Sequence, residues 1–189
     1  MSERIYELQA AQTLLKRQRA QGWAALNNLF RSGTEPSPLP SGRYVGKFVA
    51  IDIAPGLTQA AELLARLWMP WLGKTFNPAN QVGYNILTQA SYPLARFLVP
   101  LYRGYVPDQK GSYQAFAFRT YMAPGLTDPD RIVLKIDYNL KENPPLTVRR
   151  VLDELVQLAN NLYLGKAHVH WEWRRGRSWQ TVAYFTLTK

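Results

Sequence analysis

Hydrophobic and polar residues alternate with a period of two along much of the chain, which is the pattern of half-buried β-strands. The stretch 42–53 shows it first, with Val45, Val49, Ile51 and Ile53 on one face. Short turns separate most of the alternating runs, so the pattern predicts an antiparallel sheet. The further strand-like runs lie at 82–90, around 94–102, and at 112–122, 131–138, 162–173 and 179–188.

Three other segments repeat their apolar residues with helical spacing. The first covers residues 3–30 and is interrupted at Gly22, and the second covers 58–69 and ends before Pro70. The third covers 147–160. We therefore expect an α+β fold, in which an antiparallel β-sheet closes toward a small barrel flanked by these three helices.

A proline-rich stretch divides the chain. Three prolines alternate within residues 31–41, so this segment cannot be helical and is expected to run extended over the surface. The predicted organisation is an N-terminal helical arm at 1–30, a proline-rich linker at 31–41 and a β-rich main domain at 42–189.

Composition and charge limit the kinds of site and partner that the chain can have. Cysteine is absent, which excludes a disulfide framework, a thiol nucleophile and a zinc–thiolate site. The chain has 6 Trp, 11 Tyr and 7 Phe, residues that favour strands. Its net charge of +10 attracts anions such as nucleic acid or anionic lipid, or serves solubility alone. No apolar signal core and no apolar run of about 20 residues is present, so a cytoplasmic location is expected.

A Gly-Lys pair follows an apolar residue three times, ending at Lys47, Lys74 and Lys166. Glycine inside a strand marks a bend, a bulge or the close approach of another backbone. The favoured interpretation is three barrel corners with exposed lysines. The alternative is that the three lysines converge at one rim and hold an anionic headgroup.

Two sets of residues resemble known families. Gly42-Arg43-Tyr44 resembles the Gly-x-Trp opening of the lipocalin-like barrels, which implies a lipocalin-like barrel whose interior takes a hydrophobic ligand. The segments Trp68–Lys74 (WMPWLGK), Leu152–Leu155 (LDEL) and Leu162–Lys166 (LYLGK) are similar to an uncharacterised family of bacterial hypothetical proteins. That second resemblance implies a standalone domain and no particular activity.

His168, His170 and Glu172 occupy every second position and would share one face of a regular strand. Two imidazoles and a carboxylate can form a facial metal site. The same three side chains can also be the solvent-facing side of a hairpin, which is the favoured interpretation. No cofactor is expected, and a metal at these residues is kept as an option.

Arg149 and Arg150 begin the helix predicted at 147–160, where cations oppose the helix macrodipole. They either hold an anion there or pair with Asp153 and Glu154 one helical turn later. Internal pairing is the favoured interpretation.

The leading functional hypothesis is noncatalytic binding of a hydrophobic or amphiphilic ligand in the barrel cavity, with an anionic lipid-like molecule as one option. One alternative is an enzyme acting on a hydrophobic substrate in the same cavity, with Asp137 or the His168 and His170 face as its polar centre. A second is surface binding to an anionic membrane or, less favoured, to nucleic acid. The residues assigned to the ligand are Tyr44, Lys47, Lys74, Phe116, Phe118, Asp137, Arg149, Arg150 and Lys166.

Overall fold

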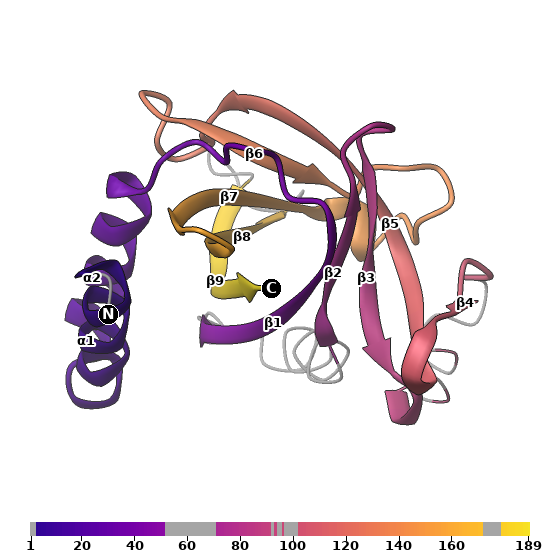
Figure 1. Ribbon diagram of the computed structural model, residues 1–189, viewed down its shortest axis with the longest axis horizontal. Coiled ribbons are helices and arrows are strands. Elements are labelled where there is room, and N and C mark those ends of the chain that lie inside the picture. The colour runs from indigo at the N-terminus through magenta and orange to yellow at the C-terminus, as the bar shows by residue number, and fades with distance from the viewer. Residues whose placement is uncertain (1–2, 52–70, 92, 94–95, 97–101, 172–178) are drawn as a thin grey trace.

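The computed structural model describes residues 3–51, 71–91, 93, 96, 102–171 and 179–189. In this part of the chain, two helices lie beside a curved antiparallel sheet (Figure 1). The helices are α1 (Glu3–Arg17) and α2 (Arg19–Ser32), with three 3-10 turns, η1 (Gln89–Ser91), η2 (Gln109–Gly111) and η3 (Val148–Arg150). The strands are β1 (Gly42–Ile51), β2 (Trp71–Asn77), β3 (Val82–Thr88), β4 (Val106–Pro107), β5 (Ser112–Pro124), β6 (Ile132–Asp137), β7 (Val151–Ala159), β8 (Leu162–His170) and β9 (Trp179–Thr188).

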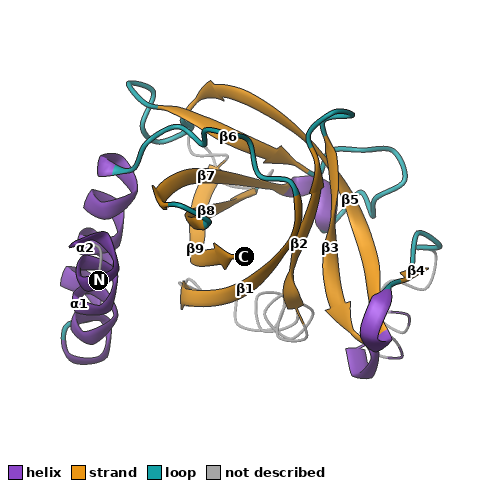
Figure 2. Cartoon of the chain, in the orientation of Figure 1, coloured by secondary structure: helices purple, strands orange, loops and turns teal. Residues whose placement is uncertain are grey.

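The sheet closes into a barrel because both ends of the strand order find partners. β1 pairs with both β2 and β9, and β3 pairs with β5, so the order β1-β2-β3-β5-β6-β7-β8-β9 returns to β1. The short β4 lies beside the end of β5 that β6 does not reach. Figure 2 shows the resulting ring of strands with the two helices outside it. The prediction of an antiparallel sheet closed toward a barrel is confirmed, with 8 strands in the closed ring.

Inside the barrel, three glycines make room for aromatic rings. An eight-stranded barrel has an interior just wide enough for its own side chains, so a large ring needs a residue without a side chain opposite it. A Cβ atom built on any of these glycines would lie 2.2–2.3 Å from the ring that it faces. The pairs are Gly46 with Trp71, Gly83 with Phe118 and Gly165 with Phe185.

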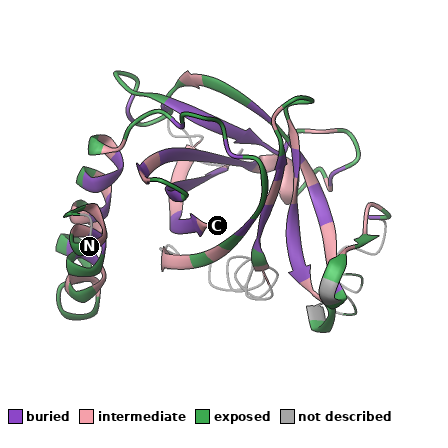
Figure 3. Cartoon of the chain, in the orientation of Figure 1, coloured by how far each residue is buried: buried purple, intermediate pink, exposed green. Residues whose placement is uncertain are grey.

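One side of the barrel is also buried from outside, beneath the helices. Leu26 and Phe30 of α2 pack against Val156, Leu164 and Tyr184 on the outer face of β7, β8 and β9. β7 and β8 are consequently buried along most of their length (Figure 3). This double burial explains the largest error of the sequence-based fold prediction.

The helix predicted at 147–160 is wrong, because residues 148–150 form η3 and residues 151–159 form β7. A strand buried on both faces carries apolar residues on both, so its period of two disappears and its spacing can imitate a helix. A tight turn then leads from β7 into β8. Its second residue, Asn161, has a φ of 56°, a conformation that asparagine tolerates better than most residues.

The helical arm predicted at 3–30 is two helices, and the break falls at Gln18 rather than at Gly22. A Cβ on Gly22 would lie 2.4 Å from the backbone nitrogen of Leu15, so this glycine permits close packing of α2 on α1. The strands expected at 82–90, 112–122, 131–138, 162–173 and 179–188 correspond to β3, β5, β6, β8 and β9.

β2 was not predicted. The helix expected at 58–69 lies outside the described residues, as does most of the strand expected around 94–102. Among the described helices, none is long and apolar enough to cross a membrane.

We expect Gly165→Ala to lower the free energy of unfolding by roughly 1–3 kcal/mol, because the added methyl group overlaps the ring of Phe185. Urea unfolding measures this. Phe185→Leu removes the overlapping ring atoms, so the two changes combined should cost less than the sum of each alone. Strict additivity would contradict ring–glycine packing at this position.

Candidate functional site

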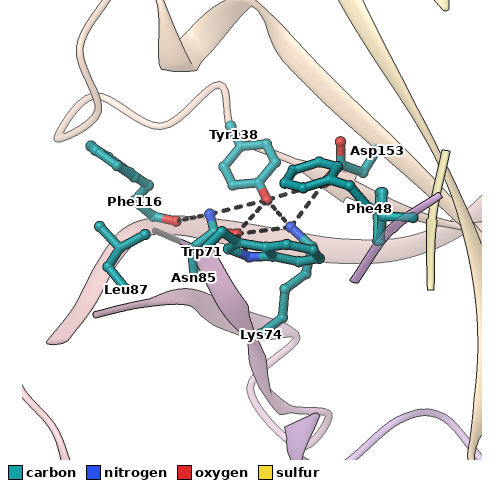
Figure 4. A pocket seen from close by; sticks show the side chains of 9 residues that line it. Phe48, Trp71, Lys74, Asn85, Leu87, Phe116, Tyr138 and Asp153 are labelled. Atoms are coloured by element: carbon teal, nitrogen blue, oxygen red, sulfur yellow. Dashed lines mark hydrogen bonds and ion pairs between the residues drawn. The ribbon is translucent and has the colours of Figure 1, made fainter. Parts of the chain in front are cut away.

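A small cavity lies in the barrel interior, lined by aromatic rings and a few polar side chains. The space open to the centre of a water molecule is about 20 Å³, enough for roughly one water. Figure 4 shows the cavity from close by. It is lined by Phe48, Trp71, Lys74, Asn85, Leu87, Phe116, Tyr138, Asp153 and Phe185.

The polar members of this wall form one hydrogen-bonded cluster centred on Lys74. Its Nζ lies 2.9 Å from Oδ1 of Asn85 and 2.9 Å from Oδ2 of Asp153, and it also donates to the hydroxyl of Tyr138. A lysine ammonium has three N–H donors, so these acceptors satisfy all of them. Lys74 and Asp153 are each only 2% exposed, which makes them a fully buried ion pair.

Aromatic rings surround the ammonium group of Lys74. Its Nζ lies 5.0–5.3 Å from the ring centroids of Trp71, Phe118, Tyr138 and Phe185, a distance at which a cation is attracted to the ring faces. Burial lowers the pKa of Lys74 below the usual lysine value, and the charge and hydrogen bond of Asp153 oppose that shift.

Asn85 and Tyr138 hold the ion pair in place. The amide nitrogen of Asn85 donates to the carbonyl of Phe116 at 3.3 Å and to the hydroxyl of Tyr138 at 3.1 Å, while its oxygen accepts from the indole of Trp71 at 3.1 Å. Burial raises the pKa of Tyr138 well above the ordinary tyrosine value, and the neighbouring Asp153 raises it further. Tyr138 therefore acts here as a neutral hydroxyl.

Irregularities in three strands coincide with the cavity wall. The pairing register shifts between Phe48 and Ala50 in β1, between Trp71 and Gly73 in β2, and opposite Phe116 in β5. Phe116 has a φ of 52°, unusual for a bulky residue. Bulges re-aim side chains and occur often next to functional sites. Phe48, Trp71 and Phe116 line the same interior space.

A second set of buried charges lies on the outer wall. Glu154 contacts the ammonium of Lys135, lies 3.1 Å from Nε2 of His168 and accepts a 2.6 Å hydrogen bond from the backbone of Leu126. Burial raises the pKa of Glu154, but His168 and Lys135 outweigh that effect and bring it to about 2. This cluster lies outside the cavity and serves the packing of the barrel wall.

The third lysine of the Gly-Lys pairs also takes part in the outer wall. Nζ of Lys166 lies 2.6 Å from Asp128 and 2.8 Å from Asn27 of α2, and Asp128 in turn meets Arg31 at 2.7 Å. Lys166 thus joins α2 to the barrel through Asp128.

The three Gly-Lys lysines do not come together. Lys74 faces the interior, Lys166 lies beneath α2, and Lys47 is exposed on β1. The expectation that all three lysines are exposed is wrong for Lys74 and Lys166, since a buried acidic partner holds each of them. The alternative of a common lysine rim is equally excluded by these positions.

Of the other residues assigned to the ligand, Phe116 lines the cavity. Tyr44 and Phe118 belong to the same interior core, where their rings pack on Phe76 at 5.8 and 5.4 Å without lining the cavity. Asp137 lies outside the cavity and pairs with Arg119 at 2.6 Å.

Arg149 and Arg150 lie at a separate surface depression together with Asp137, His170 and Trp179. Their predicted helical pairing with Asp153 and Glu154 is wrong, because those two carboxylates face opposite sides of β7 and have partners of their own. Arg149 instead donates to the side chain of Asn139 at 3.0 Å. Anion binding at this depression stays a prediction.

The predicted metal ligands are only partly described. Nδ1 of His168 lies 3.1 Å from the hydroxyl of Thr181, and the ring of His170 packs on Trp179 with centroids 5.0 Å apart. Glu172 lies outside the described residues. Within the described ranges, no three His, Asp or Glu side chains gather in a metal-binding group.

Sequence reasoning missed the partners that define the cavity. Asp153 was assigned to a helix, and Asn85, Trp71, Phe48 and Phe185 were not singled out. A usable signal was present at two of them, because a polar Asn85 within Val82–Thr88 and a charged Asp153 within an apolar run both require buried partners.

Fold and site together define a closed, eight-stranded antiparallel β-barrel with a polar cluster in its aromatic interior. A solved structure described as "Crystal structure of protein from Thermomonospora curvata" is similar to it, with a TM-score of 0.51 and 16% identity over 95% of this chain and 98% of that chain. This similarity supports the fold alone. No protein-family model and no curated protein matches the chain.

We expect Lys74→Met to lower the free energy of unfolding by about 3–5 kcal/mol, because it leaves Asp153 buried without its counter-charge. Lys74→Met combined with Asp153→Leu should recover most of that loss. The matched control is Lys47→Met at an exposed position, expected within about 0.5 kcal/mol of the wild type. Urea unfolding compares all four proteins, and a mild effect of Lys74→Met alone would contradict a buried ion pair.

We also expect Glu154 to make stability depend on acid. Its pKa of about 2 in the folded state lies below its unfolded value of 4.5, so its contribution is complete above pH 4.5 and is lost as the pH falls toward 2. The loss amounts to about 3 kcal/mol. Urea unfolding between pH 2 and 6 should show a flatter pH dependence for Glu154→Gln, while the exposed Glu142→Gln should keep the wild-type slope. Identical slopes in all three would be inconsistent with this role.

Proposed function

We propose that the protein binds a small apolar or amphiphilic ligand noncovalently inside the barrel, in the cavity beside Lys74. The buried pair of Lys74 and Asp153 carries this proposal. Buried ion pairs can often be replaced by apolar residues without loss of stability, so packing alone does not call for one. An apolar wall with a few converging polar groups is instead the usual composition of a ligand site.

The aromatic side of the cavity supports entry at Phe48 and Trp71. Leu87, Phe116, Tyr138 and Phe185 are buried, whereas Phe48 and Trp71 are only partly buried and pack on each other with centroids 5.0 Å apart. Since the cavity takes about one water as it stands, a larger ligand must displace these two rings. Their partial exposure makes them the side chains whose displacement costs least packing.

The enzymatic alternative receives less support. Its expected polar centre was Asp137 or the face of His168 and His170, and none of these residues lines the cavity. Lys74 has an acceptor for each of its N–H groups, an arrangement that favours a fixed ammonium over a free amine nucleophile.

The test uses N-phenyl-1-naphthylamine, a neutral probe whose fluorescence rises in apolar surroundings. We expect a saturable increase at a stoichiometry near one probe per chain. Leu87→Phe fills the cavity and should weaken binding at least about tenfold, and Leu146→Phe makes the same change at a position that is 75% exposed and should not. Equal binding to both variants, or no saturable binding to the wild type, would contradict the proposal. Circular dichroism checks that both variants are folded.

A further inference from the structure

Asp153 uses only one of its two carboxylate oxygens. Oδ2 lies 2.9 Å from Nζ of Lys74 and 3.1 Å from the hydroxyl oxygen of Tyr138. Oδ1 is buried and accepts no hydrogen bond from the residues that the structure describes. Figure 4 shows this second oxygen pointing away from the lysine. A buried carboxylate oxygen without a donor is costly, and because Asp153 lines the cavity, a molecule bound there can supply that donor.

The remaining polar atoms around the cavity are already matched. Lys74 has three acceptors for its three donors. The amide of Asn85 donates to Phe116 and Tyr138 and accepts from Trp71 and Lys74. The cluster therefore offers a ligand one acceptor, Oδ1 of Asp153, and no unused N–H of Lys74 or Asn85.

These hydrogen-bond partners favour a neutral ligand group over an anionic or a cationic one. An anionic group would find no unused donor on Lys74 and would be repelled by the carboxylate of Asp153. An ammonium group would meet the buried charge of Lys74, which lies within 3 Å of the same carboxylate. A neutral hydroxyl or N–H group meets neither obstacle and supplies the donor that Oδ1 lacks.

We infer that the ligand in the barrel carries a neutral hydrogen-bond donor, a hydroxyl or an N–H, which binds Oδ1 of Asp153. Its apolar body lies against Phe48, Trp71 and Phe116. This inference rests on the proposed function and adds the chemical class of the ligand to it. It makes Asp153 the residue that determines specificity, and it replaces the anionic headgroup expected from basic residues at the barrel rim.

The decisive measurement compares 1-naphthol, 1-methoxynaphthalene and 1-naphthoate on the wild-type protein at neutral pH by isothermal titration calorimetry. The three share one ring system and differ in offering a donor, an oxygen without hydrogen, or a negative charge. We expect 1-naphthol to bind at least about tenfold more tightly than either of the others, because a site built to accept a hydrogen bond rejects analogues that lack the donor.

Asp153→Asn gives an independent readout, because an amide at this position can turn an N–H toward the ligand. The preference for 1-naphthol over 1-methoxynaphthalene should then fall to about onefold or invert. Asp137→Asn makes the same change outside the cavity and should keep the wild-type ratio. If Asp153→Asn does not fold, the ratio measured on the wild type decides alone.

Each outcome bears on a different statement. Equal binding of 1-naphthol and 1-methoxynaphthalene would overturn donor recognition, with a water molecule satisfying Asp153, and would leave ligand binding in the barrel standing. Tighter binding of 1-naphthoate would overturn it in favour of an anionic ligand. If N-phenyl-1-naphthylamine and all three naphthalene probes fail to bind, the proposed function itself is wrong, and this inference with it.

Discussion

The narrow interior of the barrel determines how the core side chains pack and how small the cavity is. Eight strands enclose only enough space for their own side chains, and this chain fills that space with large rings. Gly46, Gly83 and Gly165 are the positions that accept those rings. The same shortage of space keeps the cavity near the size of one water and brings the aromatic side chains around Lys74 into contact with its charge.

Buried charge occurs on both faces of the barrel wall, with a different consequence on each. In the outer wall, Glu154 pairs with Lys135 and binds the backbone of Leu126, and Lys166 pairs with Asp128 and binds Asn27 of α2. In the interior, Lys74 has an acceptor for each of its three N–H groups, whereas Oδ1 of Asp153 accepts no hydrogen bond from the described part of the chain. β7 supplies both Asp153 and Glu154, so neighbouring residues of one strand place one buried carboxylate in the interior and one in the outer wall.

The alternation of apolar residues was sufficient to predict β1, β3, β5, β6, β8 and β9. It failed where tertiary structure changes the pattern. β7 is buried on both faces, and the bulge between Trp71 and Gly73 interrupts β2. Lys74 and Phe116 were named from local sequence, but Asp153 was not, because its segment was assigned to a helix and its partner Lys74 lies on a strand distant in the chain.

The contacts of Asp128 join α2 to the barrel across the proline-rich segment 31–41. This carboxylate lies between Lys166 of the barrel and Arg31 at the end of α2, and it is only 3% exposed. A shortened protein beginning after the segment would lack Arg31 and the apolar cover provided by Leu26 and Phe30. Its barrel would expose the pair of Asp128 and Lys166 to water within a broad hydrophobic patch. A patch of this kind favours self-association. Arg31 and Asn27 of α2 therefore complete the polar contacts of Asp128 and Lys166 on the barrel.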